Sequence, residues 1–303
     1  MTDSANDPSA ANPKPTLRER SMKLLSRALR TLCIGYAVLI GLLMLFETML
    51  VYPAPKFPSG NWEPGFSHED VEFRSADGVK IHAWLMRNYE PREQPRYILY
   101  CHGNGENVAH ASGWSGLEIV HQLGGHVLVF DYRGYGKSEG SPHEAGIKLD
   151  AERALEVLCD KFEIEPSEVI LMGQSLGGGV ATHLAATQGC KALVLQKTFS
   201  SLPDVAASMY PFAPVRWLMR NRFDSETAIE DYEGPLHQSH GETDRVVPFR
   251  FGQKVFAKTS HPLSKFVNLK KCGHNDGFPD NYWSELDNWL DEVDRHVMES
   301  SEK

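Results

Sequence analysis

The strongest constraint on the fold of this chain is a series of short, continuous apolar runs. Runs of this kind are typical of strands that are buried on both faces of a parallel sheet. We expect four such strands, with the sequences RYILYCHG, HVLVFD, EVILMGQS and KALVLQ, and two more strands later in the chain, at PLHQSHG and KFVNLKKCGH. An earlier stretch, DVEFRSADGVKIHAWLM, alternates apolar and polar residues on both sides of Asp77-Gly78, which indicates two strands joined by a turn.

Amphipathic helical patterns lie between these runs. They cover about residues 107–123, 144–162 and 176–188, and another follows the last run at NYWSELDNWLDEVDRHV. Strand–helix alternation over this length predicts an α/β fold, in which a mostly parallel central sheet carries helices on both faces. The sequence shows no internal repeat and no second domain. Residues 201–233, with the aromatic and proline-rich MYPFAPVRWLM, are compatible with either a small cap or an irregular helical crossover.

The amino-terminal region has a different composition from the rest of the chain. We expect residues 1–30 to form an amino-terminal tail, in which residues 1–16 are polar and disordered and the following residues are basic. From Thr31 to Phe46 the chain carries no charge, and extending this run to Tyr52 gives 22 residues. At about 1.5 Å per residue such a helix measures about 33 Å, enough for a hydrocarbon core of roughly 30 Å. Residues 31–52 are therefore predicted to be a transmembrane anchor.

Two alternatives to a spanning anchor are a cleaved signal peptide and a helix lying flat on the membrane. A signal peptide has a shorter region before its apolar run and ends in an A-x-A-like site, which is absent here. A flat helix is apolar on one face, whereas this run is apolar on every face. The acid Glu47 would lie near the far interface, where a carboxylate costs less than at mid-membrane.

The predicted anchor also indicates an orientation and a domain order. Lys and Arg flank only its amino-terminal side, so the positive-inside rule places residues 1–30 in the cytoplasm and the large domain on the extracytoplasmic or lumenal side. The Pro-rich residues 53–64 are predicted to tether that domain close to the bilayer. The α/β domain itself is expected over residues 65–297, and residues 298–303 form a short tail.

Charge, cysteine and histidine usage argue against several classes of protein. The formal charge is −9, and because the first thirty residues carry +3, the remainder carries −12. A body this acidic repels a phosphate backbone, so we expect no nucleic-acid partner. The five cysteines contain no CxxC pair and indicate buried free thiols, although a disulfide among the last four stays open. No HExxH occurs, and we expect neither a metal site nor a cofactor.

The stretch FDYRGYGKSEG, residues 130–140, ends like a phosphate-binding P-loop. A P-loop requires a glycine five residues before Gly136 and a helix directly behind Ser138. The first of these positions is Asp131, whose carboxylate repels a phosphate, and the second begins a Glu-Gly-Ser-Pro turn. We therefore interpret this stretch as a rigid loop at the carboxyl end of a strand, in which Arg133 pairs with a carboxylate inside the fold.

A Gly-x-Ser-x-Gly motif at Gly173–Gly177 carries the candidate nucleophile, Ser175. An apolar strand precedes it, and LGGGVATHLAA opens a helix after it. This setting favours a sharp, strained turn that lifts the serine clear of the sheet, with glycines where side chains would strike neighbouring elements. The alternative is a Gly-rich turn that holds an ordinary serine.

A serine hydroxyl requires a general base, and the base an orienting acid. The base is expected on a loop after the last strand, where VNLKKCGHND supplies His274. The acid is expected after an earlier strand, where QSHGETDRVVP supplies Asp244, with Glu242 as its close rival. The order Ser175, Asp244, His274 is the one that this strand–turn–helix architecture uses. The strand before offers only LQKTFSS, without a carboxylate.

The carbonyl attacked by a serine gathers negative charge, which requires waiting backbone donors. We assign one to the amide of Leu176, at the positive end of the helix after the nucleophile. We assign the other to the amide of Asn104, between Gly103 and Gly105, which would let the backbone approach closely. His102 is interpreted as a buttress of this loop rather than a base.

Taken together, these motifs make the chain resemble the α/β-hydrolase superfamily. More narrowly, it resembles the single-pass, membrane-anchored serine hydrolases of the α/β-hydrolase-domain group. The resemblance covers about residues 65–295 and rests on the HGN loop, D-Y-R-G-Y-G-x-S-x-G, G-x-S-x-G-G, H-G-x-x-D-x-x-V-P and G-H-N-D, which begin at His102, Asp131, Gly173, His240 and Gly273. It implies the fold and the triad but not the substrate, because such relatives include lipases, thioesterases and peptidases.

The leading hypothesis is a serine hydrolase held at the membrane through residues 31–52. Its partner would be a small-molecule or lipid substrate with an ester, thioester or amide bond, and its acyl-enzyme would be released by water. An acyltransferase, in which an alcohol replaces water, is the alternative enzyme. A hydrolase-like domain that binds without catalysis is the alternative outside enzymes.

Overall fold

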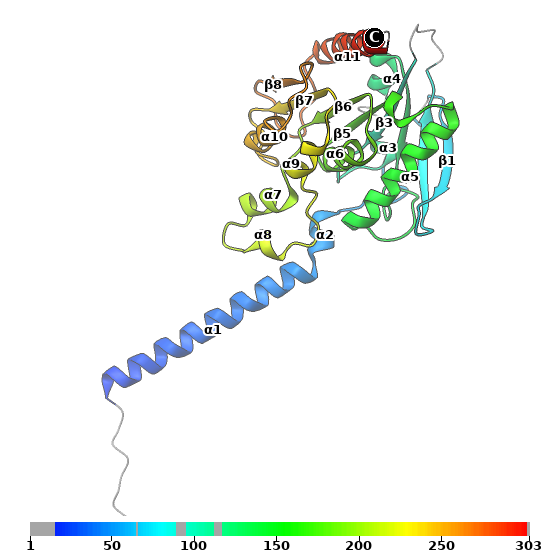
Figure 1. Cartoon of the computed structure of the whole chain (residues 1–303). Coiled ribbons are helices and arrows are strands. Elements are labelled where there is room, and N and C mark those ends of the chain that lie inside the picture. Colours follow the sequence, from blue (N-terminus) through cyan, green and yellow to red (C-terminus); the bar gives the residue numbers. More distant parts are fainter. Residues whose placement is uncertain (1–15, 65, 89–94, 112–116, 302–303) are drawn as a thin grey trace, which may run out of the picture. The chain divides into compact units, whose positions relative to one another are not determined.

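A mixed sheet organises the body of the protein, by which we mean the chain from residue 48 onward. The computed structural model describes residues 16–64, 66–88, 95–111 and 117–301 (Figure 1). The strands in this part of the chain are β1 (Glu69–Arg74), β2 (Lys80–Met86), β3 (Arg96–Cys101), β4 (Gly125–Phe130), β5 (Val169–Gln174), β6 (Ala192–Gln196), β7 (Leu236–Gly241) and β8 (Lys265–Leu269). Their order across the sheet is β1-β2-β4-β3-β5-β6-β7-β8.

The directions of the strands confirm the fold class predicted from the sequence. β1 and β2 pair antiparallel through Val71 opposite Ala83 and Phe73 opposite Ile81, as the alternating pattern around Asp77 indicated. β2 pairs antiparallel with β4, and each later pairing is parallel. Each predicted strand is present, so the continuous apolar runs were a sound guide to the sheet.

Helices cover both faces of this sheet, so its parallel strands lie between two cores. In the described residues the helices of the body, including the short 3-10 turns η2 and η3, are α2 (Glu47–Val51), α3 (Val108–Ala111), α4 (Leu117–Leu123), α5 (Glu144–Phe162), η2 (Pro166–Glu168), α6 (Leu176–Gln188), α7 (Leu202–Met209), α8 (Val215–Leu218), α9 (Ser225–Ala228), η3 (Ile229–Asp231), α10 (Phe249–Phe256) and α11 (Tyr282–Ser301). In β3, Leu99 and Cys101 face the core formed with α5, α6 and α10. Ile98 and Tyr100 face the opposite core, formed with α3, α4 and α11.

Two helical predictions differ from the structure in extent. The pattern over 107–123 forms two short helices, α3 and α4, and residues 112–116 between them lie outside the described residues. The last helix, α11, continues to Ser301, past the end predicted at residue 297, so residues 298–301 of the predicted tail are helical. This extension has a simple cause, because the sequence HVMESS contains neither Gly nor Pro to end a helix.

The amino-terminal unit, residues 1–47, is separate from the body. Its described part is one helix, α1 (Leu17–Leu45), and residues 20–45 of it are long and apolar enough to cross a membrane. The basic part of the predicted tail, from residue 17 to residue 30, is therefore helical and continuous with the apolar run, because this stretch is rich in helix-forming Leu, Arg, Lys and Met. Residues 1–15 lie outside the described residues.

The predicted carboxyl end of the anchor, at residue 52, is wrong. The continuous helix α1 ends at Leu45. Tyr52 is instead buried in the body, where its hydroxyl donates a hydrogen bond of 2.9 Å to the side chain of Asn221. Val51 packs against the same core. Apolar residues that pack in a protein core resemble those that face lipid, so composition alone placed this boundary too late.

The predicted tether at residues 53–64 lies against the body. The backbone of this segment pairs with the loop after β4, since the Gly136 amide donates to Pro55 at 2.9 Å and the Phe57 amide donates to Gly136 at 3.0 Å. Trp62 contacts Trp84 edge to face, with 5.6 Å between ring centroids. The Pro-rich composition thus marks an ordered, irregular strap and not a free linker.

Candidate active site

Ser175 lies at the turn between β5 and α6, at the carboxyl edge of the sheet. Its backbone has φ 53° and ψ −115°, which a residue other than glycine adopts only under strain. The flanking glycines are required by close backbone approach. A Cβ atom on Gly173 would lie 2.2 Å from the carbonyl oxygen of Gly177, and one on Gly177 would lie 1.9 Å from that of Cys101. The local sequence therefore produces the strained turn that the motif predicted.

Three side chains from different loops meet at this turn. The hydroxyl of Ser175 lies 3.0 Å from Nε2 of His274, and Nδ1 of His274 lies 2.7 Å from Oδ2 of Asp244. The chemistry of the groups decides which one donates in each of these two hydrogen bonds. The carboxylate can only accept, so it accepts from Nδ1–H, and the free Nε2 then accepts from the hydroxyl. The structure thus brings together the three residues that the sequence singled out.

Backbone amides hold the carboxylate of Asp244 in place. Its second oxygen accepts hydrogen bonds from the amides of Val246 and Val247, at 2.9 and 2.8 Å. Burial works to raise the pKa of Asp244, but the hydrogen bond and charge of His274 and the backbone donors outweigh it and hold that pKa below its ordinary value. The rival Glu242 is exposed and accepts from Asn268 at 2.6 Å, so it lies outside this hydrogen-bonded group.

His240 fixes the turn that carries Asp244. It is buried, donates from Nε2 to the carbonyl oxygen of Val247 at 2.8 Å, and lies 3.5 Å from Oδ2 of Asp244. Burial lowers its pKa, which favours the uncharged form of the ring. This histidine begins the H-G-x-x-D-x-x-V-P motif. Its contacts with Val247 and Asp244 explain why the motif contains both a histidine and an aspartate.

The loop that carries His274 is held by a lysine that the sequence did not point to. Lys197 follows β6 and is 1% exposed, with a left-handed φ of 49°. Its ammonium donates to the carbonyl oxygens of His274 and Asp276, at 3.2 and 2.5 Å, and lies 4.8 Å from the ring centroid of Phe278. The segment LQKTFSS that lacked an acid therefore contributes a cation that orients the loop of the base.

The two candidate oxyanion donors lie on neighbouring loops. Leu176 is the first residue of α6, and the loop of Asn104 follows β3. Cys101 at the end of β3 pairs with Gly173 in β5, which sets the two loops side by side. The side chain of Asn104 donates to the carbonyl oxygen of Val51 at 3.1 Å.

The structure shows what surrounds the glycines beside Asn104. A Cβ atom on Gly103 would meet only ordinary contacts, 3.6 Å or more away, and one on Gly105 would meet nothing within 4 Å. No described part of the chain approaches these two glycines closely, so the expected close approach of this backbone to a substrate oxyanion stays a prediction. His102 is buried and donates from Nδ1 to the carbonyl oxygen of Gly103 at 2.7 Å, as expected of a buttress.

Comparisons with known proteins show the family to which the chain belongs. A family model described as the alpha/beta hydrolase fold matches residues 97–230. Protein bem46 of Schizosaccharomyces pombe is 31% identical over 270 residues, which cover 85% of this chain and 90% of bem46. The chain belongs to the α/β-hydrolase superfamily. The alpha/beta hydrolase domain-containing protein WAV2 of Arabidopsis thaliana is 29% identical over 260 residues, 78% of this chain and 84% of WAV2, so the chain falls in the group of α/β-hydrolase-domain proteins.

Solved structures of this superfamily share the fold of the chain. The esterase Pf2001 of Pyrococcus furiosus superposes with a TM-score of 0.63 at 20% sequence identity, over 79% of this chain and 98% of the esterase. At this identity the likeness shows the fold alone.

The P-loop-like stretch of this α/β-hydrolase is a rigid structural loop. The buried carboxylate of Asp131 accepts from the amides of Val108 and Lys137, at 2.9 and 3.1 Å. A Cβ atom on Gly136 would lie 2.1 Å from that carboxylate, which explains the glycine. The guanidinium of Arg133 pairs with the buried Asp150, as close as 2.8 Å, and with Asp77 at 2.7 Å. The predicted pairing of this arginine inside the fold is confirmed.

Clusters of candidate metal ligands and disulfides are both absent from the described part of this α/β-hydrolase. There, no group of three or more His, Cys, Asp or Glu side chains is arranged to hold a metal ion. The five cysteines are all free, so the disulfide left open by the sequence does not form. Cys101, Cys159 and Cys272 are buried as expected, whereas Cys190 is partly exposed and Cys33 is exposed, against the expectation.

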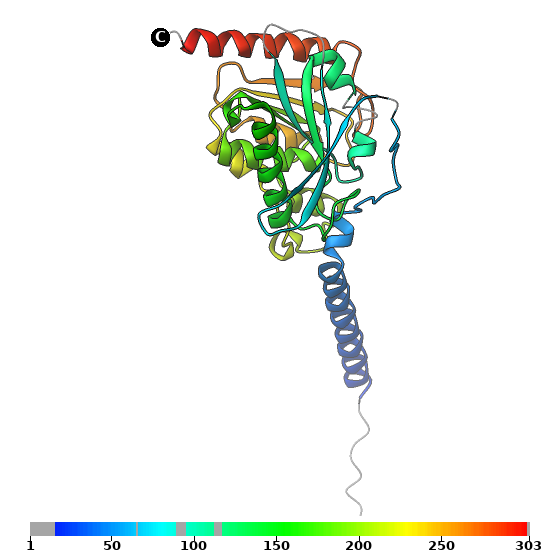
Figure 2. The same cartoon turned by 90° about the vertical axis from the view of Figure 1, so that its right-hand side faces the viewer.

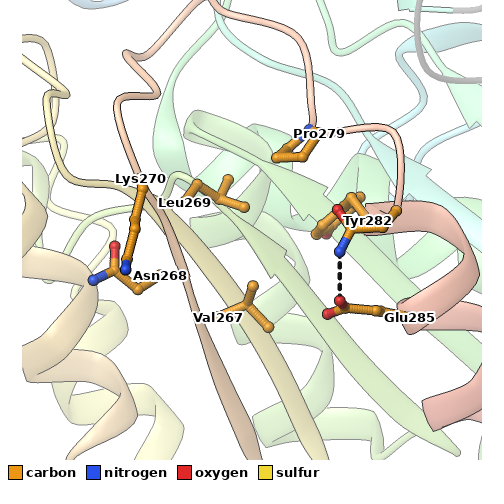
Figure 3. Close-up of a pocket in the computed structure, with 8 residues that line it drawn as sticks. Val267, Asn268, Leu269, Lys270, Pro279, Tyr282 and Glu285 are labelled. Atoms are coloured by element: carbon orange, nitrogen blue, oxygen red, sulfur yellow. Dashed lines mark hydrogen bonds between the residues drawn. The ribbon is translucent and has the colours of Figure 1, made fainter.

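A pocket of about 270 Å³ lies apart from the triad, between β8 and α11 (Figure 3). Its lining includes Val267 and Leu269 from the strand and Tyr282 and Glu285 from the helix. The side chain of Asn281 donates to Glu285 at 2.6 Å across its rim. None of the three triad residues lines this pocket, so we assign it no part in the chemistry.

Proposed function

We propose that this protein is a membrane-anchored serine hydrolase that cleaves a carboxylic ester, thioester or amide. The observation that carries the proposal is the continuous hydrogen-bonded chain from the hydroxyl of Ser175 through His274 to Asp244, at 3.0 and 2.7 Å. A nucleophile, a base within hydrogen-bond reach and an orienting acid are the parts that acyl transfer requires. Family membership supports the same chemistry.

In the proposed reaction, Ser175 attacks the substrate carbonyl while Nε2 of His274 takes the hydroxyl proton. Asp244 keeps the imidazole in the required tautomer and stabilises its cation. The amides of Asn104 and Leu176 bind the oxyanion that forms, and losing one such donor typically costs about 3–4 kcal/mol of barrier. His274 then gives its proton to the leaving group. Water, activated by the same histidine, releases the acyl group and restores Ser175.

A test of this chemistry compares the full-length protein in detergent with its Ser175→Ala variant on p-nitrophenyl esters of increasing chain length. Ser167→Ala is the matched control, because this exposed serine precedes the amino end of the strand that carries Ser175. We expect wild type and control to hydrolyse the esters and Ser175→Ala to lose activity by about 10³-fold or more. Equal activity in wild type and Ser175→Ala would reject the triad.

The same assay separates the alternative functions. Release of an acyl group to an added alcohol in preference to water would indicate an acyltransferase. If the wild-type protein is folded but turns over no ester, thioester or amide, the result would favour a domain that binds without catalysis.

We further propose that α1 spans the membrane with its basic amino-terminal end in the cytoplasm and the body on the extracytoplasmic or lumenal side. Support comes from the uncharged run from Thr31 to Phe46 and from the cations that precede it. Protease added to the outside of intact cells or to sealed lumen-side-in vesicles distinguishes the orientations. Digestion of the body outside cells, or its protection inside vesicles, would agree; the reverse pattern would overturn the orientation.

A further inference from the structure

Residues 209–222 form an unusually apolar surface on the body, which we call the cap segment. It runs from the end of α7 through α8. Within it, Met209, Phe212 and Trp217 are 47%, 55% and 87% exposed, and Tyr210 contacts Phe212 edge to face. A tryptophan with nearly all of its surface in water is costly in a monomeric soluble protein, since large exposed apolar patches mark interaction surfaces.

The charges of the cap segment contrast with those of the whole protein. The segment contains Arg216, Arg220 and Arg222 and no acid, in a chain of net charge −9. Arg216 reaches back to Asp204 on α7, and Arg222 donates to the carbonyl oxygen of Arg216 at 2.9 Å, so α8 is fixed in place. Aromatic side chains beside arginines are the composition of membrane–water interfaces, where the rings lie at headgroup level and the cations meet lipid phosphates.

The cap segment lies beside the place where the chain enters the body. Asn221, near its end, accepts the hydrogen bond of Tyr52 at 2.9 Å. Figures 1 and 2 both show α2 and α8 at the same end of the body. Tyr52 follows the last residue of α1, Leu45, by seven residues, which extended chain spans in at most about 25 Å. Whatever the orientation of α1, a helix that spans the membrane keeps this surface within reach of the bilayer.

One loop of the candidate site is hydrogen-bonded to the segment by which the chain enters the body. Asn104, the proposed oxyanion donor, is joined through its side chain to Val51 in α2. The amide of Leu202, at the start of α7, donates to the carbonyl oxygen of Arg222, which ties the cap segment to the loop that follows β6. The cap segment, the entry of the chain and the Asn104 loop are therefore linked by direct hydrogen bonds.

We propose that the cap segment docks on the bilayer that holds α1, with Trp217 and Phe212 inserted at the interface and the arginines at the phosphates. This second attachment orients the body so that its candidate site faces the membrane, and it assigns the substrate class as an acyl lipid resident in that membrane. The substrate part of this proposal rests on the proposed hydrolase function, whereas the docking part does not. A second copy of the chain and a soluble partner protein are the competing occupants.

Docking is tested with the full-length protein in vesicles of phosphatidylcholine that carry brominated acyl chains. Trp217→Phe removes the proposed probe, and Trp289→Phe is its matched control because that ring is buried on α11. We expect bromolipid to quench a component of the wild-type fluorescence that Trp217→Phe loses and Trp289→Phe keeps. Quenching of Trp217 by aqueous acrylamide but not by bromolipid would overturn docking. If Trp217 is shielded from both quenchers and a cross-linked dimer or a bound protein is found, then a second copy of the chain or that protein covers the cap segment and the bilayer does not.

The substrate part is tested with Phe212→Ser/Trp217→Ser, in which both rings are replaced outside the catalytic group. We expect hydrolysis of a short soluble ester to match wild type, and hydrolysis of an acyl lipid in vesicles to fall by about tenfold, since interfacial rings supply much of the binding. A variant that hydrolyses both the soluble ester and the acyl lipid at the wild-type rate would overturn the substrate assignment. No hydrolysis of either substrate by wild type would reject the hydrolase, while the fluorescence result would still decide docking.

Discussion

The ammonium group of Lys197 donates a hydrogen bond to the carbonyl oxygen of His274, 3.2 Å away. The two residues are 77 positions apart, and the contact joins the end of β6 to the loop of the proposed base. A second donation to Asp276 and the ring of Phe278 complete the surroundings of this cation. Lys197, directly after β6, thus binds the main chain of His274, whereas Asp244 binds the ring of the same histidine.

Lys197→Met should therefore impair catalysis through the position of His274. We expect kcat for ester hydrolysis to fall by about 10²-fold with little change in KM, because displacement of a catalytic group by about 1 Å has this effect. Lys191→Met is the control at the opposite end of β6, where the lysine pairs with Asp294. It should keep kcat. Equal kcat in both variants at similar unfolding midpoints would show that the Lys197 contact does not position the base.

Gly177→Ala should prevent correct packing of the nucleophile turn. Its Cβ atom would lie 1.9 Å from the carbonyl oxygen of Cys101, and neither backbone can move without shifting β3 or α6. We expect a loss of soluble, folded protein or a fall in melting temperature of several degrees. Gly277→Ala should leave the melting temperature unchanged, because a Cβ atom there meets nothing within 4 Å. A Gly177→Ala protein as stable as the control would contradict the packing described here.

Asp150→Ala should destabilise the body by leaving the charge of Arg133 buried. Both side chains are almost fully buried, and removing one partner of such a pair costs about 3–5 kcal/mol of unfolding free energy. Glu156→Ala, on the same helix, removes an exposed pair with Arg153 and should cost under about 1 kcal/mol. Denaturant unfolding of the full-length protein in detergent measures both, and similar costs for the two variants would be inconsistent with a buried pair.

Acid should weaken the fold through its buried histidines. Burial, with the charge of Lys265, lowers the pKa of His237 to about 3. Between about pH 6.5 and 3 the unfolded ring therefore binds a proton and the folded ring does not, so stability is full above this window and falls as the pH drops, by about 1.4 kcal/mol per pH unit. His237→Phe, in contact with Tyr282 and Trp289, should show a shallower fall. An unchanged slope would mean that this ring is protonated in the folded protein.

The sequence predicted the sheet and the candidate triad because both depend on local patterns. Strands buried on two faces must be continuously apolar, as β3 and β5 are, and the turn at Ser175 needs glycines where Gly173 and Gly177 lie. Lys197 could not be predicted in the same way. Its role depends on a left-handed backbone and on a loop far along the chain, neither of which leaves a pattern in LQKTFSS.

The carboxyl end of the anchor could not be predicted from the sequence for a different reason. Tyr52 extends an apolar run that composition assigns to lipid, yet it packs inside the body. Hydrophobicity scales measure the free energy of transfer out of water and do not distinguish lipid from a protein core. The end of α1 at Leu45 is therefore seen only in the structure.

The central claim, that Ser175 is a nucleophile activated by His274, is tested most directly by mass spectrometry after reaction with a fluorophosphonate. We expect a single phosphonyl adduct on Ser175 in the wild-type protein, none at this position in Ser175→Ala, and a labelling rate at least about 10²-fold lower in His274→Ala. Wild-type protein that stays unmodified at Ser175, or that reacts equally fast without His274, would contradict the account.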